Sequence, residues 1–237
     1  MAKSKVLQRF TAEFFVIVVG ILAALAVDDY RDYRSDRETE VFLLAQLNED
    51  LGQDLAELSS IVEDAEERFI AAQAIRRAIG DASPAPRGEI SPTVDSLAAL
   101  MSPGLAVRIL TSTLDFDITR RTFEHMSQTG GFQKLQNREL GQAISAYYRF
   151  VAAQNLTAAN EVEQRSRLVA LLERSGLTRS DDVSDDTYVA AIREDVELAA
   201  VIRNSQDLAS SLRLQFSRFR ARALELKNRI ELELANG

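Results

Sequence analysis

The sequence predicts an all-α protein, with an N-terminal transmembrane helix that continues into an elongated antiparallel helical bundle or coiled-coil stalk carrying a small distal helical subdomain. Ten glycines and four prolines among 237 residues are about half the usual combined share of roughly 12%, so few positions end a helix. Ala, Leu, Glu and Arg are abundant and lose little entropy in a helix. One apolar run and two heptad-spaced apolar stripes complete the pattern.

The apolar run predicts a single transmembrane helix at residues 10–27, behind a basic cytoplasmic tail at residues 1–9. It reads FTAEFFVIVVGILAALAV, in which Glu13 is the only charge. At about 1.5 Å per residue it spans roughly 27 Å, close to the ~30 Å core of a lipid bilayer. A cleaved signal peptide is the alternative, because Ala24-Leu25-Ala26 resembles a cleavage site. Retention is favoured, because Glu13 would place a charge in the apolar region of a signal peptide.

The charges around the run predict that the N-terminus lies in the cytoplasm. Three cations precede the run and three follow it: Lys3, Lys5 and Arg9, then Arg31, Arg34 and Arg37. The leading cations and the α-amino group crowd a nine-residue tail, whereas the following cations alternate with aspartates. We therefore expect the large C-terminal part to lie outside the cytoplasm.

Residues 28–80 are expected to extend the helix as a long stalk. No proline lies between Asp28 and Ile79. A near-heptad stripe consists of Leu44, Leu47, Leu51, Leu58, Ile61, Ala65, Ala72, Ile75 and Ile79, and its register also admits Asp54 and Arg68. Such a stripe predicts packing against a partner helix along the whole stalk.

The four prolines all lie between residues 84 and 103, which predicts a hinge and a short-helix subdomain at residues 81–136. Helices are expected around residues 92–101 and 117–128, the second ending at Gly130-Gly131. Residues 137–237 are expected to form two long helices that complete the bundle. Asn137 caps the first, Gly176 ends it, and a polar turn at 178–186 precedes the second.

The last helix carries a seam with strict 4-3 spacing, which requires a partner helix. Its members are Leu198, Ile202, Ser205, Ala209, Leu212, Phe216, Phe219, Ala223, Leu226 and Ile230. We expect the seam to pack within the same chain. An intermolecular coiled coil is the alternative, either in a homo-oligomer or with a partner membrane protein.

Two stretches, EFFVIVVGILAAL from Glu13 to Leu25 and TRRTFEHMSQTGGFQKLQNRELGQAISAYY from Thr119 to Tyr148, resemble a family of uncharacterised bacterial single-pass membrane proteins. Its members look like E-x-x-x-V-x-x-G-I-L-x-A-L near the N-terminus, followed by a helical extramembrane domain. This chain departs from the family at Asp28-Asp29-Tyr30, where an Asn-Asn-Trp-like stretch is usual. The resemblance implies a bacterial single-pass membrane protein, and it implies no activity. Together with the orientation expected from the charges, this predicts an inner-membrane protein whose C-terminal domain is periplasmic.

Five residues are candidates for contacts with lipid or a partner span: Glu13, Gly20, Ala24, Tyr30 and Tyr33. Glu13 either snorkels to water or pairs with a cation on another span. Gly20 and Ala24 form a small-x-x-x-small face that allows close helix approach in lipid. Tyr30 and Tyr33 suit an interfacial aromatic belt.

The remaining motifs favour structural roles. His125 lacks a second histidine and a nucleophile elbow, and Thr129-Gly130-Gly131 is interpreted as a helix cap rather than a phosphate loop. The acidic run Asp181, Asp182, Asp185 and Asp186 lacks the glycine of a calcium loop and is interpreted as a turn capped by Ser184. The arginines Arg213, Arg218, Arg220 and Arg222 are interpreted as a solvated face that pairs with Glu63, Glu66 or Glu67 rather than as an anion site.

The composition excludes several classes of function. The chain has no cysteine and one histidine, so we expect no metal, no cofactor and no enzymatic activity. A net charge of −8 argues against nucleic acid as a partner. The leading hypothesis is a membrane-anchored helical structural or interaction module, and the alternative is an extracytoplasmic bundle that senses a small molecule.

Overall fold

A computed structural model describes residues 2–81, 83, 92–114, 118–153, 155–177 and 183–236, with side chains described from Ile17 onward except at 155–159. Every regular element in these ranges is helical, so the prediction of an all-α protein is confirmed. The helices are α1 (Ala2–Ile79), α2 (Pro92–Leu100), α3 (Pro103–Thr111), α4 (Arg121–Thr129), α5 (Gly131–Lys134), α6 (Arg138–Ala153), α7 (Asn155–Arg174), α8 (Asp185–Glu194) and α9 (Val196–Asn236).

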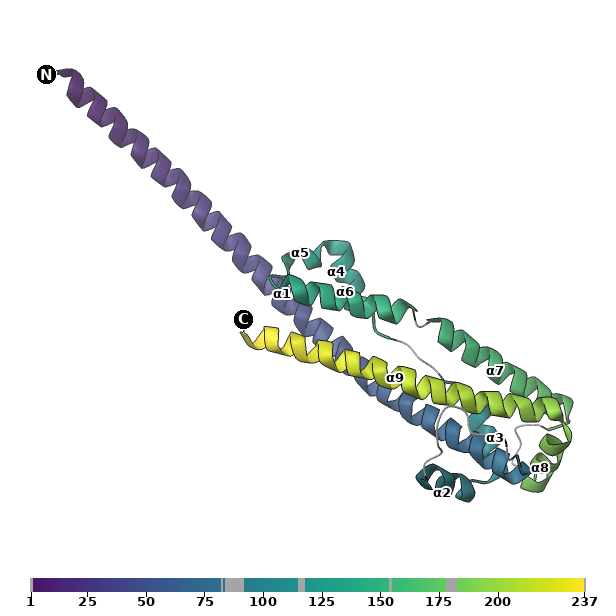
Figure 1. Ribbon diagram of the computed structural model, residues 1–237. Helices are drawn as coiled ribbons and strands as arrows, with labels where there is room; N and C mark the ends of the chain where they lie inside the picture. Colours follow the sequence, from purple (N-terminus) through teal and green to yellow (C-terminus); the bar gives the residue numbers. More distant parts are fainter. Residues whose placement is uncertain are drawn as a thin grey trace.

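The long helices α1 and α9 form the axis of the molecule. They run antiparallel and side by side, with α6 and α7 along them and α2, α3 and α8 at the far end (Figure 1). The N-terminal part of α1 continues beyond the bundle as a projecting rod, and the C-terminus lies near the point where the rod leaves the bundle (Figure 1). The molecule is therefore a helical bundle with one long unpaired extension.

The core consists of two groups of buried side chains along the α1–α9 axis. The group nearer the projecting rod joins α1 and α9 to α4, α5 and α6, with Leu47, Met126 and Phe219 at its centre. The far group joins the end of α1 to α2, α3, α7, α8 and the start of α9, around Ile75 and Ile192. Helix α1 thus takes part in both groups and holds the two ends of the bundle together.

Local capping explains where several helices begin and end. The Leu140 N–H donates to Asn137 Oδ1 at 3.0 Å, and the Thr187 N–H donates to Ser184 Oγ at 3.3 Å, so both predicted N-caps are confirmed. Gly130 and Gly176 adopt φ of 74°, a left-handed conformation that favours glycine after a helix. The predicted ends at these glycines are confirmed.

Some boundaries differ from the sequence-based expectation. Helix α1 ends at Ile79 as expected. Helix α3 was not predicted from the sequence, and the helix expected at 117–128 begins only at Arg121. The last helix is divided into α8 and α9 at Asp195, whose backbone is extended and whose carboxylate accepts the N–H groups of Glu197 and Leu198. Asp195 is a strong N-cap, so it restarts the helix at this point. The acidic positions 181 and 182 lie outside the described residues.

The described residues contain no single helix that is long and apolar enough to cross a membrane. Helices α2 and α3, joined at a bend of 107°, reach that length and composition only as a pair. Buried residues of both helices, such as Val94 and Val107, belong to the far core group. The predicted span at residues 10–27 starts at positions whose side chains lie outside the described part of the chain.

Candidate functional site

The projecting part of α1 exposes apolar side chains on every side. From residue 17 to residue 27 the exposed large residues are Ile17, Val19, Ile21, Leu22, Leu25 and Val27, each with 54–61% of its surface accessible. At 100° per residue these positions are distributed all round the helix. A helix that is apolar all round requires an apolar environment, either lipid or protein. Within the part of the chain that the structure describes, nothing else covers this stretch (Figure 1).

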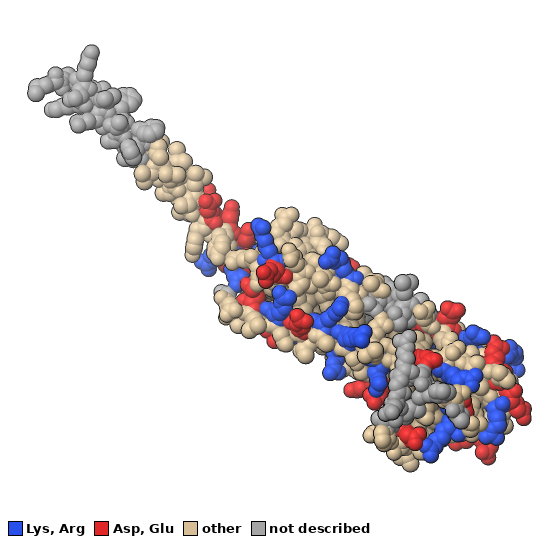
Figure 2. Space-filling view, in the orientation of Figure 1, with Lys and Arg blue, Asp and Glu red and all other residues tan. Residues whose placement is uncertain are grey.

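The apolar surface ends abruptly at a charged segment. Figure 2 shows an uncharged tan stretch of the rod followed by red and then blue atoms near the bundle. Tyr30 and Tyr33, 65% and 58% exposed, lie at this change. Arg34 and Glu38 form an exposed ion pair at 3.1 Å, and the bundle begins at Glu40, which is fully buried.

The small-residue face of the rod is open. A Cβ added to Gly20 would meet no atom within 4 Å, and Ala24 is exposed. The face predicted from Gly20 and Ala24 is therefore free to meet another helix. The Glu13 side chain lies outside the described residues.

The heptad seams of α1 and α9 are buried within one chain. Leu44, Leu47, Leu51 and Leu58 on α1 are fully buried, and Leu212, Phe216, Phe219, Leu226 and Ile230 on α9 are at most 4% exposed. All nine belong to the same core group. Within one chain, these seam residues of α9 therefore pack in the same core group as those of α1.

Polar residues at seam positions of α1 hold the connecting segments. Glu40, Asp54 and Arg68 lie 14 residues apart, at one heptad position, and all three are buried. Glu40 accepts the Gln136 N–H at 2.9 Å, Asp54 accepts the Thr119 N–H at 2.9 Å, and Arg68 donates to the Ser112 carbonyl at 2.6 Å. Each bond fixes the chain just before or just after a short helix.

Three further contacts, made by Arg68 and Arg76, join other segments to α1. Arg68 also pairs with Glu161 of α7 at 2.9 Å, and the buried Arg76 donates to Gln206 of α9 at 2.5 Å and to the Ser83 carbonyl at 2.6 Å. The sequence places Asp54 and Arg68 in the apolar stripe of α1, but it does not predict their hydrogen-bond partners. The only available signal was a charged residue at an apolar heptad position, which indicates a buried polar group with a specific partner.

Asp54 lies in an unusual electrostatic environment. Burial raises the pKa of this carboxyl to about 6, although the hydrogen bond from Thr119 acts in the opposite direction. The Tyr147 hydroxyl donates to Asp54 at 3.5 Å, and burial followed by the nearby Asp54 charge raises the tyrosine pKa as well. The group is enclosed in the core, so its role is to position α4 and α6 rather than to meet a substrate.

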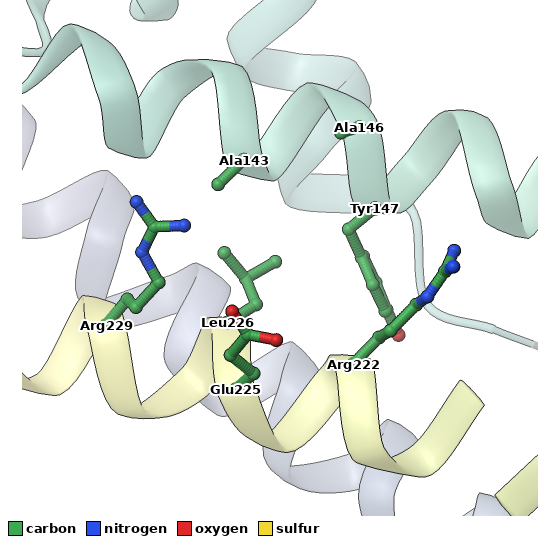
Figure 3. A pocket seen from close by; sticks show the side chains of 7 residues that line it. All are labelled: Ala143, Ala146, Tyr147, Arg222, Glu225, Leu226 and Arg229. Carbon is green, nitrogen blue, oxygen red and sulfur yellow. The ribbon is translucent and has the colours of Figure 1, made fainter. Parts of the chain in front are cut away.

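A groove between α6 and α9 has a volume of about 270 Å³. Figure 3 shows Ala143 and Ala146 on α6 facing Leu226 on α9, with Arg222 and Arg229 toward opposite ends and Glu225 between them. The Arg222 guanidinium lies 4.0 Å from the Phe150 ring centre, an attractive cation–π distance. Arg222 therefore covers an aromatic ring instead of pairing with the glutamates of α1.

A second and larger cleft, about 720 Å³, lies over the other face of α6. Its walls come from α4, α5 and α6, and its lining includes Phe123, Phe132, Arg138 and Arg149. Both clefts border α6, so this helix separates two accessible cavities at the end of the bundle nearer the rod.

The remaining sequence candidates take structural positions. His125 is exposed on α4, and the described residues contain no group of His, Asp and Glu side chains that could hold a metal ion. Asp185 accepts the Gly104 N–H at 2.8 Å and so ties α8 to α3. Arg213 approaches Glu66 at 3.9 Å, which is the cross-helix pairing expected for the arginine face.

No protein-family model, curated protein or solved structure matches this chain. The family resemblance noted from the sequence therefore stays a prediction. The fold and its surfaces define an all-helical bundle with a projecting apolar helix, two exterior clefts and, among the described residues, no metal-binding cluster.

Proposed function

We propose that this protein is a membrane-anchored helical module. In this proposal residues 10–27 cross a bacterial inner membrane once, the N-terminus stays in the cytoplasm, and the bundle works in the periplasm as an assembly or interaction domain. The observation that carries the proposal is the rod of α1, where six large apolar side chains between Ile17 and Val27 are more than half exposed and point to different sides of the helix. Exposed apolar surface of this extent marks contact with a membrane or another protein.

The segment between the rod and the bundle supports a bilayer as the environment. Glu40 lies thirteen positions after Val27, which corresponds to about 20 Å of helix. This segment carries alternating charges and the exposed Tyr30 and Tyr33. Tyrosines beside an apolar span are typical of the membrane–water interface, so the bundle would lie clear of the headgroups on a rigid spacer.

The surfaces left for assembly are the rod and the outside of the bundle. The α1 and α9 seams are filled within the chain, so a second copy would pack along the open Gly20–Ala24 face. A partner membrane protein has a further surface at the far end. There Leu97, Leu100 and Leu105 are 47%, 86% and 40% exposed beside Glu63 and Glu67 of α1.

Sensing of a small molecule is the second candidate function. The two clefts along α6 favour it, because helical bundles bind ligands between or beside their helices. In this reading the bundle would bind a periplasmic solute and pass the signal to a partner through the rod.

Single-cysteine labelling tests the proposed topology, and the natural chain contains no cysteine that would interfere. Ser127, exposed on α4, and Ser4, in the basic tail, are each changed to cysteine in the full chain. In intact spheroplasts, Ser127→Cys should react with a membrane-impermeant maleimide, whereas Ser4→Cys should react only after lysis. Labelling of Ser4→Cys alone in intact spheroplasts would reverse the topology, and equal labelling of both would contradict a single span.

A further inference from the structure

The larger cleft over α6 has the chemistry of an anion site with an aromatic wall. Phe123 and Phe132 are half-buried and meet edge to face, with ring centres 5.7 Å apart. Phe123 also stacks on Tyr148 of α6 at 4.3 Å, with the ring planes 16° apart. The stack fixes the Phe123 ring, so the cleft has a preformed apolar wall that needs little ordering to receive a flat ligand.

The cleft is also lined by a polar stripe along α6. Arg138, Gln142, Ser145 and Arg149 follow one another at intervals of four, three and four residues, which places them on one face of the helix. Both arginines are exposed, and neither forms an ion pair with any described residue. Guanidinium groups are strong donors to carboxylates.

Among the described residues that line this cleft, none is acidic. Besides the two aromatic rings and the two arginines it consists of apolar and neutral polar residues. This separates it from the groove between α6 and α9, where Glu225 lies between Arg222 and Arg229. On a chain with a net charge of −8, a lining whose described residues include two arginines and no carboxylate is a local exception that favours a negatively charged ligand.

The dimensions indicate the size of the ligand. A volume of about 720 Å³ falls within the range of roughly 300–1,000 Å³ that is typical of small-molecule sites. Arg138 and Arg149 are 11 residues apart, or about 16 Å along α6. An aromatic body of two fused rings fits against the phenylalanines while its acidic group reaches one of these arginines.

We propose that this cleft binds an aromatic carboxylate, with Phe123 and Phe132 contacting the ring system and either Arg138 or Arg149 pairing with the carboxylate. The site gives a ligand class to the second candidate function, the sensing bundle. Ligand binding in this cleft does not require that α1 cross a membrane. A negative binding result would therefore leave the proposed membrane anchor untouched, and loss of the anchor would leave the binding site untouched.

The test compares three flat probes of the same size on the full chain in mild detergent: 2-naphthoate, the neutral 2-naphthylmethanol and the cationic 2-naphthylmethylamine. Isothermal titration, with the micelle blank subtracted, gives the dissociation constants. 2-Naphthoate should bind at least about tenfold more tightly than either other probe, as expected when one charged hydrogen-bonded pair is added. Its affinity should also fall in 0.5 M salt.

Variants of the two arginines test whether the preference for 2-naphthoate arises in this cleft. The double variant Arg138→Gln/Arg149→Gln should lose the preference for 2-naphthoate, and the two single variants show which arginine binds the carboxylate. Arg218→Gln, an exposed position on α9 outside the cleft, is the matched control and should keep the preference. Circular dichroism checks that each variant retains its helices. Equal affinity of the wild-type chain for all three probes, or an unchanged preference in the double variant, would overturn the proposal.

Discussion

The Asp54 carboxylate accepts the backbone N–H of Thr119 at 2.9 Å from inside the core of the bundle. The bond joins the middle of α1 to the segment that enters α4. The neighbouring Asp50 repeats the arrangement one turn earlier, accepting the Thr122 N–H at 3.3 Å. Two carboxylates of α1 thus fix the start of α4, which supplies Phe123 to the aromatic wall of the larger cleft.

Asp54→Asn should change the pH dependence of stability. The pKa of Asp54 is about 6 in the folded chain against 3.8 for an ordinary aspartate. Because the folded pKa is the higher one, folding favours the protonated form. This contribution is complete below about pH 3.8 and is lost as the pH rises through 6.

Relative to wild type, Asp54→Asn should therefore become more favourable between pH 4 and pH 7. The change should be up to about 3 kcal/mol, because one pKa unit corresponds to about 1.4 kcal/mol. Urea unfolding of both proteins at pH 4, 5.5 and 7 measures it. Ser59→Ala, on the same helix and outside the core groups, is the control. Parallel stability curves for wild type and Asp54→Asn would contradict the environment described for this carboxyl.

Arg68→Met removes the guanidinium that pairs with the buried Glu161 at 2.9 Å. Arg68→Met alone is expected to cost about 3–5 kcal/mol of unfolding free energy, the range for breaking a buried ion pair from one side. The double variant Arg68→Met/Glu161→Gln should cost clearly less than the sum of the single changes, because it removes both charges. Chemical unfolding of the four proteins in the cycle measures the coupling. A coupling near zero would mean that the 2.9 Å contact contributes nothing to stability.

Phe219→Ala should destabilise the bundle by about 3–5 kcal/mol, the usual cost of deleting a fully buried phenylalanine side chain. Phe219 has no exposed surface and contacts the rings of Tyr147 and Phe150, with centres 5.6 and 5.3 Å away. Leu224→Ala, at a position of α9 that is 48% exposed, should cost less than about 1 kcal/mol. If the two variants unfold at the same denaturant concentration, the seam of α9 is not the core of this bundle.

The oligomeric state should depend on the rod rather than on the seams. A fragment that begins at Asp36 retains the buried seam positions and should be monomeric, because α1 and α9 fill each other's seams. If the full chain associates in detergent, Gly20→Ile should weaken the association by blocking close helix approach. Light scattering gives both masses. A stable dimer of the fragment would show that an outer surface of the bundle, not the rod, drives assembly.

The sequence predicted the helical class, the end of α1, the seams and the glycine and asparagine caps, because these depend on local spacing and backbone preference. It did not predict the division at Asp195. Aspartate is tolerated inside a helix and is also a favoured N-cap residue, and only the packing around Asp195 determines which of the two positions it takes. It also did not predict the bonds from Glu40, Asp54 and Arg68 to distant backbone groups. Their partners lie 96, 65 and 44 residues away, and no local pattern encodes such distances. The clefts beside α6 escaped prediction for the same reason.

Alkaline carbonate extraction of membranes tests whether residues 10–27 anchor the chain in the bilayer. The full chain and a chain that begins at Asp28 behind an added initiator methionine are expressed in the same bacterium, and the washed membranes are separated by centrifugation. If residues 10–27 cross the bilayer, the full chain stays in the membrane pellet and the shortened chain appears in the supernatant. Recovery of the full chain in the supernatant together with the shortened chain would contradict it.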